Sequence, residues 1–192
     1  MLEKLFISEV RIDILRLMLT HPDEQYHVRA IVRAVDAEIN AVRRELNRLE
    51  EVDLLTNRRS SNRLYYRVNT ANPYYSDLLS LIAKDLELAK NIIESAKQLG
   101  DVKFAMLSTD FVRGRESTVL DVDLFFVGKP DVSFLRSIVE RAEEKMEKEI
   151  NYSVMTLDEF NHRKRSNDQF INRVLTQGRT MLIGDESRFA SR

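Results

Sequence analysis

Apolar residues recur at helical spacing through most of the first 51 residues of the chain, in three successive segments. Ser8 is placed to cap the first of these segments, and Asp36 is placed to cap the third. Two shorter runs rich in β-branched and aromatic residues follow and are typical of strands, and the polar connection between them predicts a hairpin loop. The expected elements are helices over 8–20, 28–35 and 36–51, strands over 54–56 and 64–68, and a loop over 57–63.

A break at residues 71–75 (ANPYY) precedes a longer helical pattern over 76–99. Its apolar positions predict one long helix, which would act as a spacer or as a dimerisation element. After Gly100-Asp101 the chain alternates between short apolar runs and helical patterns, which predicts a small α/β domain. The expected strands of this part cover 104–107, 124–127, 150–155 and 181–183, with a helix over 133–148 and two short helices before the last strand.

The composition narrows the kinds of chemistry that the chain can perform. Its 30 lysines and arginines are balanced by 31 acidic residues, so any binding to nucleic acid must come from a local patch. The absence of cysteine excludes disulfides and thiolate sites, and three histidines far apart in the sequence predict no metal site. No segment has the apolar core of a signal peptide, nor the roughly 20 apolar residues that span a bilayer. We therefore expect a cytoplasmic protein without membrane association.

The third helical segment carries a face of arginine and asparagine. Positions 40, 43, 44 and 47 follow the spacing i, i+3, i+4 and i+7, so their side chains share one side of a helix. Arginine can pair bidentately with guanine and asparagine with adenine, and either can hold a phosphate. The candidate DNA-contacting residues of this segment are Asn40, Arg43, Arg44, Asn47 and Arg48.

The connection between the two strands adds Arg58, Arg59 and Arg63 without an intervening acidic residue. Such a loop can follow a phosphate backbone or enter a minor groove. Three helices followed by a hairpin resemble the winged helix-turn-helix family, which implies a third helix in the major groove and a wing on the flanking DNA. Two alternatives stay open: the arginines pair with glutamates of the same helix, or the winged helix binds a protein.

A second resemblance lies between Phe104 and Gly128. Arg113-Gly114 is followed, just before an apolar strand, by Asp121-Val122-Asp123. This arrangement resembles the nucleotidyltransferase superfamily in its minimal, DNA polymerase β-like form. The resemblance covers residues 100–184. It implies a Gly-Ser turn that binds the nucleotide phosphates, and two aspartates that hold two magnesium ions together with a third carboxylate.

The chain departs from that family at two of its motifs. Alignment on Arg113-Gly114 puts Thr109-Asp110 where Gly-Ser is expected, which replaces the glycine and adds negative charge beside a triphosphate. The strand over 150–155 offers no carboxylate. We therefore expect an inactive site without catalytic residues, metal or cofactor, in which Asp121 and Asp123 are relics hydrogen-bonded at the start of a strand. The alternative is a retained, weak site for magnesium or a nucleotide.

These observations predict an α+β chain with a winged helix-turn-helix over 1–70, a linker or dimerisation helix over 71–100, and a nucleotidyltransferase-like domain over 101–192. The expected function is a sequence-specific transcriptional regulator that binds double-stranded DNA as a homodimer, with the second domain as a scaffold, a sensor or the surface for a protein partner. The alternative is an active nucleotidyltransferase that adenylylates a protein, as in toxin–antitoxin pairs, with the winged helix as its docking module. The basic run His162–Arg165 is expected to be a solvated face, with phosphate contact as its alternative.

Overall fold

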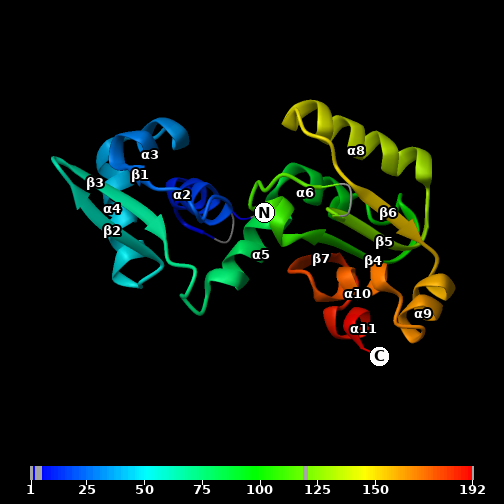
Figure 1. The fold of residues 1–192 in the computed structure, drawn as a ribbon. Coiled ribbons are helices and arrows are strands. Elements are labelled where there is room, and N and C mark those ends of the chain that lie inside the picture. Colours follow the sequence, from blue (N-terminus) through cyan, green and yellow to red (C-terminus); the bar gives the residue numbers. More distant parts are fainter. Residues whose placement is uncertain (1, 3–5, 119–120, 192) are drawn as a thin grey trace. The chain divides into compact units, whose positions relative to one another are not determined.

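The computed structural model describes residues 2, 6–118 and 121–191, and the chain divides into two compact units, Met1–Ile82 and Ala83–Arg192 (Figure 1). Each unit combines helices with one small sheet, so the chain is mixed α+β, as expected. No helix in the described part of the chain is long and apolar enough to cross a membrane.

Three helices form the core of the first unit: α2 (Glu9–Thr20), α3 (Val28–Val35) and α4 (Ile39–Glu51). Each packs against the other two and contributes fully buried apolar side chains, among them Ile14, Ile31 and Leu46. Ser8 caps α2 as predicted, because its Oγ accepts a hydrogen bond from the backbone N–H of Arg11. The apolar periodicity of the sequence therefore identified all three helices.

The start of α4 differs from the prediction. Asp36 ends α3 instead of capping α4, since it adopts a left-handed φ of 46° and its backbone N–H donates to the carbonyl of Val32. The cap of α4 is Glu38, whose carboxylate accepts hydrogen bonds from the backbone N–H groups of Asn40 and Ala41. One acidic residue thus closes a helix and another opens the next, and sequence spacing alone does not separate the two roles.

The sheet of the first unit is antiparallel and has the order β1-β3-β2, with β1 (Tyr26–His27), β2 (Leu55–Ser60) and β3 (Arg63–Val68). The loop predicted over 57–63 is wrong, because most of those residues continue the strands and only Ser61 and Asn62 form the turn. Ser61 has a φ of 52°, as a tight hairpin turn requires. Arg58 lies opposite Tyr65, and an aromatic residue favours strand pairing with the residue across from it.

The long helix expected over 76–99 is two helices, α5 (Tyr75–Asp85) and α6 (Glu87–Glu94). Leu86 between them has an extended backbone, with φ −60° and ψ 141°. Buried apolar positions stop at Ala83 and resume at Leu88, a step of five residues that does not stay on one face of a helix. The prediction of one continuous helix is therefore wrong. The boundary between the two units falls within α5, and a role of this segment in dimerisation stays a prediction.

The second unit is built on a sheet of order β6-β5-β4-β7, in which β5 and β6 are parallel and the other neighbours are antiparallel. Helices α6 and α8 lie on one face of this sheet, and α9, α10 and α11 lie on the other (Figure 1). All four strand segments expected from the sequence lie in it. The bounds are β4 (Gly100–Ser108), α7 (Thr109–Val112), β5 (Leu124–Pro130), α8 (Val132–Met146), β6 (Tyr152–Met155), α9 (Leu157–Arg165), α10 (Gln169–Thr176), β7 (Arg179–Ile183) and α11 (Glu186–Ala190).

An aromatic cluster holds α9 and α11 against this sheet. The ring of Phe125 on β5 is fully buried and lies 6.0 Å from that of Phe160 on α9 and 6.4 Å from that of Phe189 on α11. The rings of Phe160 and Phe189 stack on each other with their centroids 5.2 Å apart. Aromatic pairs of this kind contribute about 0.5–1.5 kcal/mol each beyond the area they bury. The cluster therefore fixes α9 and α11 side by side.

Candidate nucleic-acid interface

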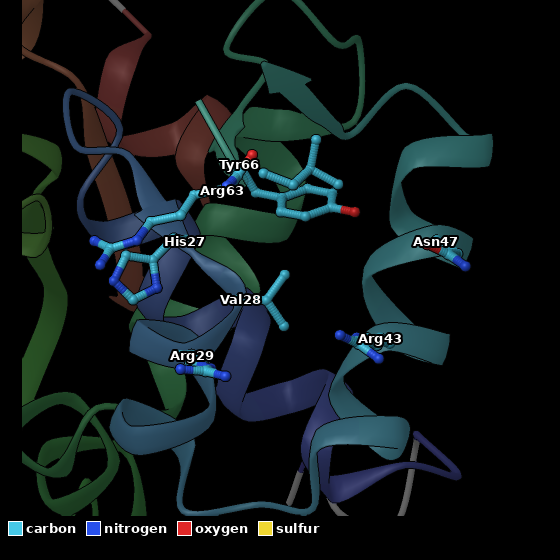
Figure 2. Close-up of a pocket in the computed structure, with 9 residues that line it drawn as sticks. His27, Val28, Arg29, Arg43, Asn47, Arg63 and Tyr66 are labelled. Atoms are coloured by element: carbon cyan, nitrogen blue, oxygen red, sulfur yellow. The ribbon is translucent and has the colours of Figure 1, made fainter. Parts of the chain in front are cut away.

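A groove with a volume of about 530 Å³ opens on the surface of the first unit, between α3, α4 and β3. Figure 2 shows that side chains from all three elements point toward it. Its lining is His27, Val28, Arg29, Arg43, Asn47, Asn62, Arg63, Leu64 and Tyr66. Three arginines and two asparagines meet there, and no acidic residue is among the described side chains that line it.

Helix α4 presents Arg43 and Asn47 one turn apart on the side that faces the groove (Figure 2). Val42 and Leu46 are fully buried beneath them and hold the helix against the core. The apolar seam of α4 therefore also decides which of its polar side chains reach the groove.

Arg29 lies in the first turn of α3, where His27 is the capping residue. Nδ1 of His27 accepts a hydrogen bond from the backbone N–H of Ala30 at 3.1 Å. The ring of His27 also packs edge-on against Tyr65 of β3, with the centroids 5.8 Å apart. The cap thus ties the start of α3 to the hairpin, which brings Arg29 to the same groove as Arg63.

Ion pairing separates the arginines of the first unit into two groups. Arg11, Arg16 and Arg48 pair with carboxylates of α2 and α4. The others are exposed and form no ion pair within the described residues: Arg29, Arg33, Arg43, Arg44, Arg58, Arg59, Arg63 and Arg67. No acidic residue occurs in the sequence from Leu54 to Thr70 to offer such a pair. A nearly neutral chain therefore concentrates unneutralised positive charge on α3, α4 and the hairpin.

Only part of the predicted arginine and asparagine face of α4 lies in the groove. Arg43 and Asn47 line it together with Arg63, whereas Asn40 and Arg44 are exposed outside its lining. The groove is therefore formed by the side of α4 that faces the hairpin.

The two remaining hairpin arginines, Arg58 and Arg59, are neighbours in β2 and so point to opposite faces of the hairpin. The register puts Arg58 on the same face as Arg63 and Arg67, two residues of β3. Three arginines thus share the outer face of the hairpin.

Arg48 is not part of the groove lining and pairs with Glu45 of the same helix. The carboxylate of Glu45 is buried and accepts hydrogen bonds from Nε of Arg11 at 2.7 Å and from a guanidinium nitrogen of Arg48 at 2.9 Å. Burial works to raise the pKa of Glu45, but Arg11, the hydroxyl of Ser8 and the charge of Arg48 together outweigh it and hold the pKa below its ordinary value. Local pairing, one of the alternatives for the arginines of this helix, therefore describes Arg48.

We expect Glu45→Gln to lower the free energy of unfolding by about 1–3 kcal/mol at neutral pH, because a buried carboxylate would lose two charge-assisted hydrogen bonds. The native pKa of Glu45 is depressed, so this carboxylate stabilises the fold above the ordinary glutamate pKa. Its contribution is lost as the pH falls through the native pKa. Urea unfolding of the variant and the wild type over a pH series should therefore show a difference that disappears in acid.

The matched control for this prediction is Glu51→Gln, since Glu51 is exposed on the same helix. Its effect on the free energy of unfolding should stay within about 0.5 kcal/mol. Equal losses for the two variants would contradict the role assigned to Glu45.

The acidic pair of the second unit lies just before β5. Asp123 is only 2% exposed, and its carboxylate accepts hydrogen bonds from Oγ of Ser117 at 2.5 Å and from the backbone N–H of Asn151 at 2.9 Å. Asp121 is exposed and accepts hydrogen bonds from the backbone N–H and the hydroxyl of Thr118, which hold the pKa of Asp121 below its ordinary value. Both carboxylates accept hydrogen bonds within the chain, and their assignment as relics stays a prediction.

Internal contacts also occupy the turn at Thr109-Asp110 and the segment that leads into β6. The backbone N–H of Thr109 donates to the carbonyl of Gly178 at 2.8 Å, and Asp110 pairs with Arg115 at 2.9 Å. Asn151, on the segment leading into β6, donates its backbone N–H to Asp123. Strand β6 itself carries no acidic residue. Among the described residues, no three histidine, aspartate or glutamate side chains are grouped so as to hold a metal ion.

Comparison with known proteins gave no matching family model and no matching curated protein. The function must therefore be inferred from the geometry of the chain itself. That geometry offers two features: a basic groove lined by side chains that can read bases, and an acidic pair whose oxygens are bonded within the chain.

The sequence did not indicate several side chains of this surface, among them Arg29, Asn62 and Tyr66 in the groove and Arg67 on the hairpin. Arg29 could have been found, because it lies on the polar side of a short helix whose other side is apolar. Tyr66 is 3% exposed, and burial together with the charge of Glu50 raises its pKa, while the nearby Arg43 opposes that rise. No local signal in the sequence indicates that Tyr66 of β3 and Arg43 of α4 line the same groove.

Proposed function

We propose that the first unit is a winged helix-turn-helix domain that binds double-stranded DNA, and that the protein is a sequence-specific transcriptional regulator. In this proposal α4 lies in the major groove, and the hairpin of β2 and β3 is the wing. One observation carries the proposal. Arg29, Arg43 and Arg63 come from three separate elements, converge on one groove, and have no carboxylate partner within the described residues.

The side chains divide naturally between reading bases and holding phosphates. Arg43 and Asn47 lie one turn apart on α4, and their guanidinium and amide groups match the edges of guanine and adenine. Arg29 at the start of α3 and Arg63 on the hairpin flank that helix, where a phosphate backbone would pass. The outer hairpin face with Arg58 adds further contacts to phosphate.

The second unit would be a catalytically inactive, nucleotidyltransferase-like domain that acts as a scaffold or a sensor. Its order of strand, short helix, strand and helix agrees with that family, and Arg113-Gly114 and the aspartate pair occur at the matching positions. The internal bonds of Asp121 and Asp123, and the lack of an acidic residue on β6, favour an inactive site over a transferase. A homodimer in the cytoplasm would let two copies of α4 read two half-sites.

Selection from a pool of random duplexes, followed by fluorescence anisotropy in a salt series, tests this function. We expect an enriched sequence to bind about 1,000-fold or more tightly than an unrelated duplex at physiological salt. Equal affinity for every duplex would mean that the protein binds DNA only through non-specific charge attraction. Absence of binding at low salt would exclude DNA as the partner and favour the protein-docking alternative.

A further inference from the structure

A polar pocket with a volume of about 550 Å³ lies in the second unit, between α9 and α11. It is lined by Asn161, Lys164, Arg165, Asn167, Arg188 and Ser191. Half of these side chains are cationic, and none of the described residues in the lining is acidic. A solvated basic face would be convex, whereas these cations surround a hollow that an anion can enter.

Lys164 is the anchored cation of this pocket. Its Nζ donates to the backbone carbonyl of Phe189 at 2.6 Å and lies 5.0 Å from the centroid of the Phe160 ring. Burial and, after it, the positive charge of Arg179 hold the pKa of Lys164 below its ordinary value. An ammonium carries three N–H donors, so donors beyond the one used by Phe189 remain for a ligand. A cation in positive surroundings is strongly stabilised by an anion beside it.

The arginines that line the pocket form no ion pair within the described residues, unlike Arg163 on α9. Arg163 pairs with Glu159 at 2.7 Å and is not part of the lining. Arg165 and Arg188 line the pocket, are exposed, and form no ion pair within the described part of the chain. Asp185 lies close to Arg188, but its carboxylate accepts the backbone N–H of that residue instead.

We propose that this pocket binds the phosphate group of a small phosphorylated ligand of nucleotide size. Two guanidinium groups offer paired N–H donors in the geometry that phosphate oxygens accept, and the ammonium of Lys164 adds a point charge. The amides of Asn161 and Asn167 can bond to the polar remainder of such a ligand. The hollow of about 550 Å³ has the volume of a small-molecule site. This inference does not depend on DNA binding by the first unit.

Isothermal titration calorimetry of the full chain with AMP, pyrophosphate and adenosine at constant ionic strength tests the proposal. We expect AMP and pyrophosphate to bind with a Kd of about 1 mM or lower, and adenosine not to bind. The variant Arg165→Gln/Arg188→Gln keeps side-chain length and polarity but removes two charges, and should bind AMP about tenfold more weakly. Lys164→Met should weaken binding as well.

The matched control is Arg136→Gln/Arg141→Gln, which removes the same charge from exposed positions of α8 in the same unit. It should bind AMP like the wild type, and thermal unfolding midpoints without ligand should show that both double variants fold. Absence of AMP and pyrophosphate binding in the wild type, equal loss in both double variants, or equal binding of adenosine would overturn the proposal. So would weakened duplex DNA binding by Arg165→Gln/Arg188→Gln without any binding of small phosphates, because the pocket would then contact nucleic acid.

Discussion

A variant in which Arg29, Arg43 and Arg63 are all replaced by alanine should bind its preferred duplex about 100- to 10,000-fold more weakly than the wild type. The three guanidinium groups line one groove and lack carboxylate partners within the described residues, so their removal costs no internal ion pair. The loss therefore belongs to contacts with DNA. Fluorescence anisotropy at constant salt measures it, and thermal unfolding shows that the variant is folded.

The matched control is Lys97→Ala/Arg136→Ala/Arg141→Ala, which removes three exposed positive charges from the second unit. This control should bind the preferred duplex within about threefold of the wild type, since these residues do not line the groove and exposed charges are screened at physiological salt. Arg48→Ala should also have a small effect on DNA binding, because Glu45 holds Arg48. Comparable losses in all these variants would mean that binding depends on diffuse charge and that the groove is not the interface.

Single variants separate the two kinds of contact within the groove. Arg43→Ala should cost about 1–3 kcal/mol and relax the base preference at one position of the enriched sequence. Arg63→Ala should weaken every duplex similarly and reduce the slope of log affinity against log salt by about one unit. A change of base preference by Arg63→Ala would assign the hairpin, not α4, to base reading.

Most of the elements of the first unit could be predicted from its sequence because each rests on a local signal. Apolar residues at helical spacing identified α2, α3 and α4, and Ser8 indicated where the first of them begins. The same periodicity placed Arg43 and Asn47 on the exposed side of α4, where they lie. The exposure of a side chain on an amphipathic helix follows from the pattern that buries the opposite side.

The errors arose where contacts between distant segments decide the structure. The strands of the hairpin extend into the predicted loop, where Arg58 pairs with Tyr65 across the strands. A run of polar residues does not by itself indicate such strand pairing. Arg48 is among the candidate DNA-contacting residues of the sequence, but a buried Glu45 shared with Arg11 of another helix holds it. Which side chains line the groove likewise depends on how α3 packs against the hairpin, through the cap formed by His27.

In the second unit, Asp123→Ala should lower the free energy of unfolding by about 2–4 kcal/mol, because the hydroxyl of Ser117 and the backbone N–H of Asn151 would lose the buried carboxylate that accepts their hydrogen bonds. Asp121→Ala should cost less than about 1 kcal/mol, since Asp121 is exposed and its partner Thr118 can bond to water. Millimolar magnesium alone should leave the unfolding midpoint of the wild type unchanged. Urea unfolding and thermal scans measure these effects.

The sign of the Asp123 effect distinguishes a structural carboxylate from a metal-binding one. Two carboxylates placed to share metal ions repel each other when the ions are absent, so removing one of them stabilises the metal-free fold or leaves it unchanged. Magnesium would then raise the unfolding midpoint of the wild type, because a ligand that binds only the native state stabilises it. A stabilising Asp123→Ala together with a magnesium-dependent midpoint would therefore restore the transferase alternative. A destabilising Asp123→Ala without any magnesium effect is the result that the hydrogen bonds to Ser117 and Asn151 lead us to expect, since those bonds hold the loop before β5 against the start of β6.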